Sequence, residues 1–166
     1  MLSLTKAHAY GNDFLYVRED AVEGSDLAAL ARELCERHEG IGADGLVVYT
    51  PTPDGASMRL FNADGSRAEI SGNGVRALGA ILVRGVAEVG AQVVVTTEAG
   101  PKPLTRTAVV GSRQTFRAAM GLPRDLRRAS VRVGEEELAL VVMDIGNPQV
   151  VLLGPLPDRA RFARLG

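Results

Sequence analysis

The chain has 166 residues, 46% hydrophobic and 23% charged, which suits one soluble domain with a core of its own. Its formal net charge of −1 gives no electrostatic reason to expect a nucleic-acid partner. Cys35 is the single cysteine, so an internal disulfide is excluded, and with only two histidines we expect no metal site. No apolar run approaches the roughly 18 residues of a membrane span, and the N-terminal residues lack a signal-peptide core, so we expect a cytoplasmic protein.

Strand-like segments dominate the chain. Residues 3–9 and 13–19 flank the turn formers Gly11 and Asn12. Residues 44–50 and 56–62 flank PTPDG, a good hairpin connection. The series continues with residues 91–100, 103–111, 113–121, 129–133 and 136–154, the last interrupted by Gly146, Asn147 and Pro148. The pattern predicts a large, mostly antiparallel sheet.

A helix is predicted over residues 25–38. Ser25 is the expected N-cap, and Asp26 follows it where a negative charge favours the helix N-terminus. Apolar residues recur at helical spacing on one face: Leu27, Leu30, Ala31, Leu34 and Cys35. A single apolar face indicates a helix on the surface of the domain.

A second helix is predicted from about residue 73 to 84. Its apolar residues cover almost the whole circumference, and only Arg76 and Arg84 interrupt them. A helix that is apolar nearly all round belongs in the interior. The sequence therefore predicts an α+β fold in which a curled, mixed or antiparallel sheet wraps around one central buried helix.

The residues before this helix, Ser71-Gly72-Asn73-Gly74, allow two interpretations. A buried helix must satisfy its first N–H groups, and the two glycines let a ligand approach the backbone. The positive end of the helix would favour an anion there. Alternatively, Ser71 is only an N-cap and residues 62–66 are only a turn.

Four segments, in order, resemble the diaminopimelate epimerase family, which comprises cofactor-independent racemases of lysine and peptidoglycan biosynthesis. HAYGNDFLYV (8–17) resembles H-G-x-G-N-D-F, and RHEGIGADGLVV (37–48) resembles G-I-G-A-D-G. FNADGSRAEISGNGVR (61–76) resembles N-x-D-G-S-x-x-x-x-C-G-N-G-x-R. DIGNPQVVL (144–152) resembles M-G-N-P-H-x-V.

The resemblance implies a fold of two pseudo-symmetric domains with the active site in the cleft between them. Residues 1–155 would form the N-terminal domain, and residues 156–166 would start the crossing to a second domain that this chain lacks. We expect that missing domain to complete the cleft, and the isolated chain to be inactive. An open cleft face could also pair two chains as a homodimer.

The activity implied is interconversion of LL- and meso-diaminopimelate without a cofactor. Two cysteines, one from each domain, would act as acid and base on opposite faces of the α-carbon. Ser71 stands where the first of these cysteines belongs, and a hydroxyl is a much weaker acid than a thiol. His8, Asp64 and Glu69 are candidate bases for it. Ala77 and Gln149 also depart from the family pattern, which indicates a divergent natural branch.

The resemblance assigns substrate binding to five residues. The side-chain amides of Asn12, Asn62 and Asn147 match positions that hold the substrate, and Gly72 and Asn73 match the backbone donors to its α-carboxylate. Two other functions stay open. One is a related amino-acid racemase or isomerase with another substrate. The other is a paralogue that binds an amino acid or anion without turnover, which Ser71 keeps plausible.

Other polar and reactive residues have structural interpretations. Asp13 and Asp44 are expected to make structural hydrogen bonds, His8 to be a partly buried strand residue, and Cys35 to face the core. Six arginines lie in residues 113–132, followed by Glu135 to Glu137. We interpret them as a solvated sheet face neutralised by these glutamates, in preference to a nucleic-acid site.

Overall fold

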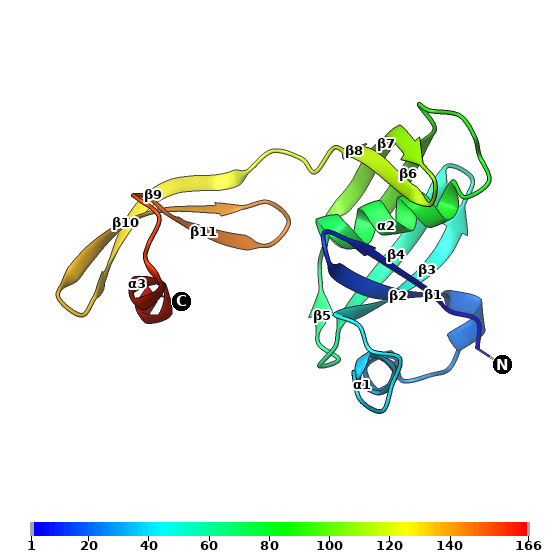
Figure 1. The fold of residues 1–166 in the computed structure, drawn as a ribbon, viewed down its shortest axis with the longest axis horizontal. Helices are drawn as coiled ribbons and strands as arrows, with labels where there is room; N and C mark the ends of the chain where they lie inside the picture. Colours follow the sequence, from blue (N-terminus) through cyan, green and yellow to red (C-terminus); the bar gives the residue numbers. More distant parts are fainter. Residues whose placement is uncertain (1, 166) are drawn as a thin grey trace. The chain divides into compact units, whose positions relative to one another are not determined.

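The computed structural model of the chain describes residues 2–165 (Figure 1). They form two compact units that divide between Met120 and Gly121, whereas the sequence interpretation placed residues 1–155 in one domain. That residues 156–166 start an interdomain crossing stays a prediction. Each unit is described by itself below.

The first unit contains one sheet and two α-helices. Its strands are β1 (Thr5–Ala9), β2 (Asn12–Arg18), β3 (Gly45–Thr52), β4 (Gly55–Asn62), β5 (Arg67–Ala68), β6 (Gln92–Thr97), β7 (Gly100–Val110) and β8 (Arg113–Ala118). Its helices are the 3-10 helix η1 (Glu19–Val22), α1 (Leu27–Cys35) and α2 (Gly72–Leu82). The predicted hairpin 44–62 is confirmed, because β3 and β4 pair from Gly45↔Asn62 to Thr52↔Gly55.

The sheet has the strand order β1-β2-β3-β4-β6-β7-β8, with β5 paired to β4 outside this path. Its β2–β3 and β4–β6 pairs are parallel, and its other pairs are antiparallel. Alternation along β2 sends Phe14 and Tyr16 to one core cluster, and Leu15 and Val17 to another. The strand is therefore covered on both faces.

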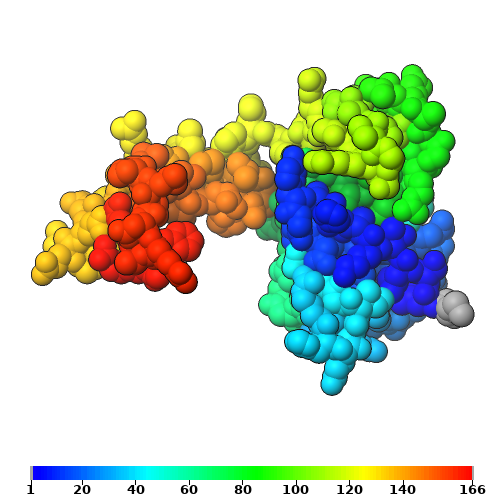
Figure 2. Space-filling model, in the orientation of Figure 1, coloured from blue at the N-terminus to red at the C-terminus, as the bar shows by residue number. Residues whose placement is uncertain are grey.

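Helix α2 lies at the centre of this unit, as predicted. It contacts β1, β2, β4, β6, β7 and β8, and none of its residues is exposed. Figure 1 shows the sheet curling around it, and in the space-filling view of the same face β1 and β8 leave little of the helix visible (Figure 2). The predicted α+β fold, with a curled mixed sheet around a buried helix, is confirmed.

Helix α1 covers the outer face of the sheet, where Ala31 and Cys35 are buried against β3 and β4. The prediction that Ser25 is its N-cap is wrong. The Asp26 carboxylate fills that role, accepting from the backbone N–H groups of Ala28 (3.0 Å) and Ala29 (3.1 Å). The helix ends at Cys35 rather than at residue 38, because the following Glu36 carboxylate accepts the backbone N–H groups of the next turn.

Replacing each of the two candidate N-cap residues by alanine, in separate variants, tests which one caps α1. Asp26→Ala is expected to lower the free energy of unfolding by about 0.5–2 kcal/mol, because two backbone donors lose their acceptor. Ser25→Ala is the matched control and should change it by less than about 0.5 kcal/mol. Urea denaturation followed by circular dichroism measures both, and equal losses in the two variants would contradict the assignment.

The β1–β2 turn is formed by Tyr10 and Gly11 rather than by Gly11 and Asn12. Both turn residues have positive φ, 55° and 86°, as a two-residue hairpin turn requires. Ala9 pairs with Asn12, which is therefore the first residue of β2. The shift by one residue puts the Asn12 side chain at the end of the sheet.

The second unit contains β9 (Arg124–Val133), β10 (Glu136–Asp144), β11 (Pro148–Leu152) and α3 (Arg159–Leu165). Its three strands form an antiparallel sheet with β10 in the middle. Leu138 is the one buried hydrophobic residue of this unit within the described part of the chain. A sheet with so little covered apolar surface lacks a core of its own.

The arginine run divides between the units, with Arg113 and Arg117 on β8 and the other four on β9, all exposed. A solvated face is therefore confirmed. Glu136 pairs with Arg161 (2.5 Å) and Arg164 (3.1 Å) of α3 and not with the arginine run, while neutralisation of the run by Glu135 and Glu137 stays a prediction. Within residues 2–165, no helix has the length and apolar character needed to cross a membrane.

Candidate functional site

Three strands present polar residues at one end of the first sheet. Asn12 begins β2, Gly45 begins β3 and Asn62 ends β4. The parallel register Phe14↔Gly45 and the antiparallel register Gly45↔Asn62 place these strand ends side by side. Residues that are 50 positions apart in the chain therefore meet through sheet pairing.

The N-terminus of α2 lies at the same end. Ser71 is its N-cap, and its Oγ accepts the backbone N–H of Gly74 at 3.1 Å. Its carbonyl oxygen accepts the N–H of Val75 at 2.9 Å. The N–H groups of Gly72 and Asn73 have no hydrogen-bond acceptor within the described residues. These two donors sit at the positive end of a buried helix, where an anion is favoured.

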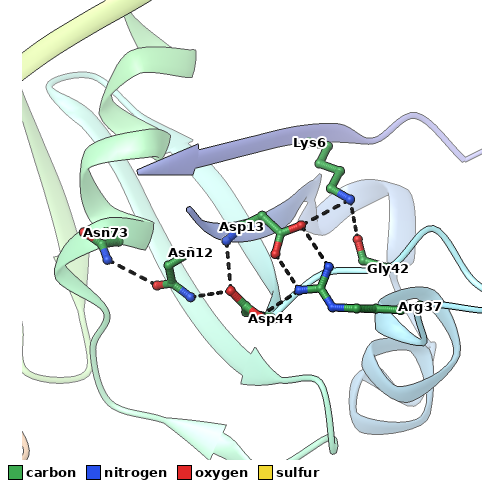
Figure 3. A network of polar contacts seen from close by, with 7 residues as sticks. All are labelled: Lys6, Asn12, Asp13, Arg37, Gly42, Asp44 and Asn73. Atoms are coloured by element: carbon green, nitrogen blue, oxygen red, sulfur yellow. Dashed lines mark hydrogen bonds and ion pairs between the residues drawn. The ribbon is translucent and has the colours of Figure 1, made fainter. Parts of the chain in front are cut away.

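A hydrogen bond joins the helix N-terminus to the sheet. The Asn73 Nδ2 group donates to Asn12 Oδ1 at 3.4 Å, and both side chains are half-buried (Figure 3). The structure thus brings together Asn12, Ser71, Gly72 and Asn73. The residues of this set come from two distant motifs, and the Asn12–Asn73 contact is what connects them.

Two further side chains hold the first turn of α2, and sequence reasoning missed both. The buried Tyr16 hydroxyl donates to the Gly74 carbonyl at 3.0 Å, and burial raises the pKa of Tyr16 well above its usual range. Arg76 folds back to donate from Nη1 to the Gly72 carbonyl at 2.9 Å. A positive charge therefore lies beside the proposed anion position. The only sequence signal for the Arg76 contact was the presence of one arginine among the apolar residues of this helix.

Asn62 lies near the same end but is held by its own turn. Its Nδ2 group donates to Ser66 Oγ at 2.9 Å, and its backbone N–H donates to the Ser66 carbonyl at 2.8 Å. The Asp64 carboxylate accepts the Ser66 N–H at 2.8 Å. Residues 62–66 are thus a turn, as the second interpretation expected. The exposed Asn62 side chain makes no described hydrogen bond to Asn12 or Asn73.

None of the candidate bases for Ser71 makes a described hydrogen bond to it. His8 lies in β1, as expected, but it is exposed rather than partly buried. Its alternating position on an edge strand turns it to solvent. It lines a shallow depression of about 570 Å³ together with Lys6, Ala7, Gly11, Asp13 and Arg37.

A cluster of four charged residues adjoins Asn12. Arg37 bridges the carboxylates of Asp13 and Asp44, with Nη2–Oδ1 distances of 2.8 Å to each. Lys6 Nζ lies 3.2 Å from the Asp13 carboxylate. The Arg37 guanidinium, and with it the Lys6 ammonium, holds the pKa of Asp13 well below its usual range. The structural hydrogen bonding expected of Asp13 and Asp44 is confirmed.

This cluster makes the free energy of unfolding depend on pH in the acidic range. The pKa of Asp13 is lower in the folded chain than in the unfolded chain. As the pH falls, the unfolded chain therefore takes up a proton at Asp13 before the folded chain does, and unfolding becomes more favourable. The stabilisation is fully present above about pH 4, the unfolded pKa, and is lost as the pH falls further. Asp13→Asn should therefore show a shallower loss of unfolding free energy between about pH 4 and pH 2. Equal slopes for the two proteins in urea titrations at each pH would contradict this.

Asn147 belongs to the second unit, in the connection between β10 and β11. Its Oδ1 accepts from Gln149 Nε2 at 3.1 Å, and its carbonyl accepts the N–H of Ile145 at 3.2 Å. Gln149, at the position where the family has histidine, thus orients the Asn147 amide locally. The role of Asn147 in substrate binding stays a prediction.

Cys35 is buried as predicted, and burial raises its pKa to about 11, so the thiol is kept in its unreactive protonated form. The His, Cys, Asp and Glu side chains of residues 2–165 form no group of three or more that could hold a metal ion.

Comparison with known proteins identifies the family whose members share this sequence and fold. A family model described as diaminopimelate epimerase matches residues 4–124. The diaminopimelate epimerase of Desulforudis audaxviator is 35% identical over 99% of this chain, and that of Pelotomaculum thermopropionicum is also 35% identical over 99%. The chain spans 64% and 65% of the length of these two relatives.

Solved structures agree on the fold. A predicted epimerase from Pseudomonas aeruginosa matches with a TM-score of 0.64 at 14% identity, covering 86% of this chain and 53% of that one. A hydroxyproline epimerase from Agrobacterium vitis matches with a TM-score of 0.57 at 15% identity, covering 84% of this chain and 47% of that one. Since the family model matches most of the sequence, including the strand ends and the helix N-terminus described above, the chain belongs to the diaminopimelate epimerase family.

Proposed function

We propose that the protein containing this chain interconverts LL- and meso-diaminopimelate by moving the α-proton from one face of the α-carbon to the other, without a cofactor. The observation that carries the proposal is the pair of N–H donors at Gly72 and Asn73, next to Ser71 and Asn12, in a chain of this family. The proposal covers the substrate, the mechanism and the role of each residue.

An amino-acid α-proton is very weakly acidic, so its removal needs stabilisation of the charge that flows into the carboxylate. The N–H groups of Gly72 and Asn73 lie at the positive end of α2, and the Arg76 guanidinium lies close to the same turn. A carboxylate held there would gain two hydrogen bonds and a favourable field. The amides of Asn12, Asn62 and Asn147 would hold the rest of the substrate.

Ser71 would provide the acid–base group on one face. Its Oγ accepts from Gly74 N, which leaves its own O–H free to turn toward a ligand at the helix N-terminus. A hydroxyl is a weaker acid than a thiol, so we expect slower proton transfer than a cysteine at this position would give. The second acid–base group would come from sequence that this chain does not contain.

The relatives are longer than this chain, which supports a site completed by a second domain. We therefore expect the 166-residue chain alone to catalyse no epimerisation. The check is deuterium wash-out from α-labelled diaminopimelate, compared with buffer alone. Release well above the buffer rate, in a chain shown by sedimentation to be monomeric, would contradict this expectation.

A second function is favoured by one specific observation, the use of Ser71 Oγ as a helix cap. Under this alternative the site binds an amino acid or another anion at Gly72 and Asn73 without turnover. A related racemase of another amino acid is the other alternative, because a carboxylate held at Gly72 and Asn73 is common to all amino acids and does not select their side chains.

The experiment that separates these functions uses the complete gene product. Incubation with LL-diaminopimelate should produce the meso isomer, detected by chiral chromatography. Binding without product, measured by calorimetry, would favour the non-catalytic alternative. Product from proline or another amino acid, with none from diaminopimelate, would favour the related racemase.

A further inference from the structure

The Asn12 side chain is held on one side by Asp44, which has no assigned role in the reaction. Its Nδ2 group donates to Asp44 Oδ2 at 2.7 Å, and its Oδ1 accepts from Asn73 at 3.4 Å (Figure 3). An ionised carboxylate can only accept hydrogen bonds, so Nδ2, and not Oδ1, must face Asp44. This fixes Oδ1 toward the N-terminus of α2.

Asp44 is itself fixed on both oxygens. Oδ2 also accepts the backbone N–H of Asp13 at 3.0 Å, and Oδ1 accepts from Arg37 Nη2 at 2.8 Å. Arg37 is in turn anchored by the Asp13 carboxylate, and Lys6 bridges that carboxylate to the Gly42 carbonyl at 2.6 Å. Asp44, Arg37 and Asp13 are therefore each held by at least one contact beyond the one that links them toward Asn12 (Figure 3).

Stabilisation of the fold through the largely covered Asp13 carboxylate does not account for the Arg37–Asp44 pair. The side chains of Arg37 and Asp44 are 54% and 40% exposed, and ion pairs in water at such exposure contribute little to folding. The four charges, two positive and two negative, also sum to zero, so the cluster attracts an anion to the helix N-terminus less than an unpaired cation would. What remains is orientation of the amide.

We propose that Arg37 and Asp44 are positioning residues that set the orientation of the Asn12 amide and, through it, of the Asn73 side chain beside the two N–H donors of α2. The catalytic consequence rests on the proposed function. A flipped Asn12 amide would point its oxygen at the Asp44 carboxylate, which is repulsive, and its NH₂ at Asn73, which would then have to flip as well. The pair Asp44–Arg37 excludes that state.

The test uses two variants and a matched pair of controls. Asp44→Ala removes the carboxylate that accepts from the Asn12 side chain. Arg37→Met removes the guanidinium that donates to the other oxygen of the Asp44 carboxylate. Arg18 and Asp20 form a similar exposed ion pair, with a 2.7 Å contact and no described contact to the cluster. Arg18→Met and Asp20→Ala therefore control for the loss of an arginine–aspartate pair.

The direct readout is the side-chain NH₂ resonances of Asn12 and Asn73 in ¹H–¹⁵N spectra. Asp44→Ala and Arg37→Met should shift both pairs of resonances and speed their exchange with solvent, with the backbone spectrum elsewhere unchanged. The two controls should move neither pair. If Asp44→Ala remains folded and leaves the Asn73 side-chain resonances in place, the proposal is wrong. If it does not fold, Arg37→Met decides by the same criterion.

A second readout concerns turnover by the complete gene product. Misplacement of substrate-binding amides should lower kcat/KM by about 10- to 100-fold in both variants, measured at a temperature well below the Tm of each. Wild-type kcat/KM in either variant would overturn the catalytic part of the proposal. If the wild-type protein shows no turnover, the proposed function fails, and the spectra still decide whether Arg37 and Asp44 orient the two amides.

Discussion

Arg106→Met is expected to lower the free energy of unfolding by about 2–4 kcal/mol, the largest stability effect predicted for a single side chain of this protein. Arg106 is 2% exposed, and no carboxylate within the described residues pairs with it. Its guanidinium instead donates to the carbonyls of Val83 (3.3 Å), Val86 (2.6 Å) and Glu88, and to the Gln114 side chain (3.1 Å).

These acceptors explain the size of the effect. The Val83 carbonyl lies at the C-terminal, negative end of α2, where the guanidinium caps it. The carbonyls of Val86 and Glu88 lie in the loop that leads to β6. Methionine would leave the buried Val83 carbonyl and the three part-buried acceptors without this donor, and an unpaired buried group costs about 1–3 kcal/mol. Sequence reasoning gave no sign of this role, because Arg106 looks like any polar residue of an alternating strand.

The matched control is Arg113→Met on the neighbouring strand. Arg113 is exposed and has no described ion pair, so its loss should change stability by less than about 0.5 kcal/mol. Urea unfolding measured by circular dichroism compares the two. A loss below about 1 kcal/mol for Arg106→Met would show that water or a neighbouring donor replaces the guanidinium.

Ser71→Ala in the complete gene product should slow α-proton exchange by about 10²- to 10⁴-fold, which is the usual contribution of a positioned acid–base group. Ser71→Cys should accelerate exchange, because a thiol at a helix N-terminus ionises much more readily than a hydroxyl. Both are measured as deuterium incorporation at the α-carbon of diaminopimelate.

The cap role of Ser71 complicates the alanine variant, since loss of the Gly74 contact costs about 0.5–2 kcal/mol by itself. Ser71→Gly separates the two roles, because glycine at an N-cap costs only a few tenths of a kcal/mol and has no hydroxyl. It should fold like the wild-type protein and exchange as slowly as Ser71→Ala. Unchanged exchange in Ser71→Gly would reduce Ser71 to a helix cap.

The fold was predictable where local pattern and burial agree. The apolar circumference of residues 73–84 predicted the central helix, and the 51–55 connection predicted the β3–β4 hairpin. Predictions failed by one residue where two capping or turn residues compete. Asp26 caps α1 in place of Ser25, and Tyr10, an unusual residue for positive φ, takes the first turn position. Local propensity alone cannot rank such neighbours.

Local pattern indicated an anion at the N-terminus of the central helix as one of two interpretations, whereas the participation of Asn12 was predictable only through the family motifs. Ser71, Gly72 and Asn73 are consecutive, but Asn12 joins them by a contact across 61 positions. The Arg37–Asp44 pair depends on the parallel register of β2 and β3, which no local pattern specifies. The division between Met120 and Gly121 falls in the connection between β8 and β9, where Gly121 and Pro123 mark a break in the strand pattern but do not by themselves indicate a change of unit.

The central claim is that the first turn of α2 binds the α-carboxylate of an amino acid. Backbone ¹H–¹⁵N spectra of the complete, isotope-labelled gene product, titrated with meso-diaminopimelate, test it most directly. The account predicts that the amide resonances of Gly72 and Asn73 shift saturably and move downfield as they gain an anionic acceptor. Saturable binding that leaves both resonances in place would contradict it.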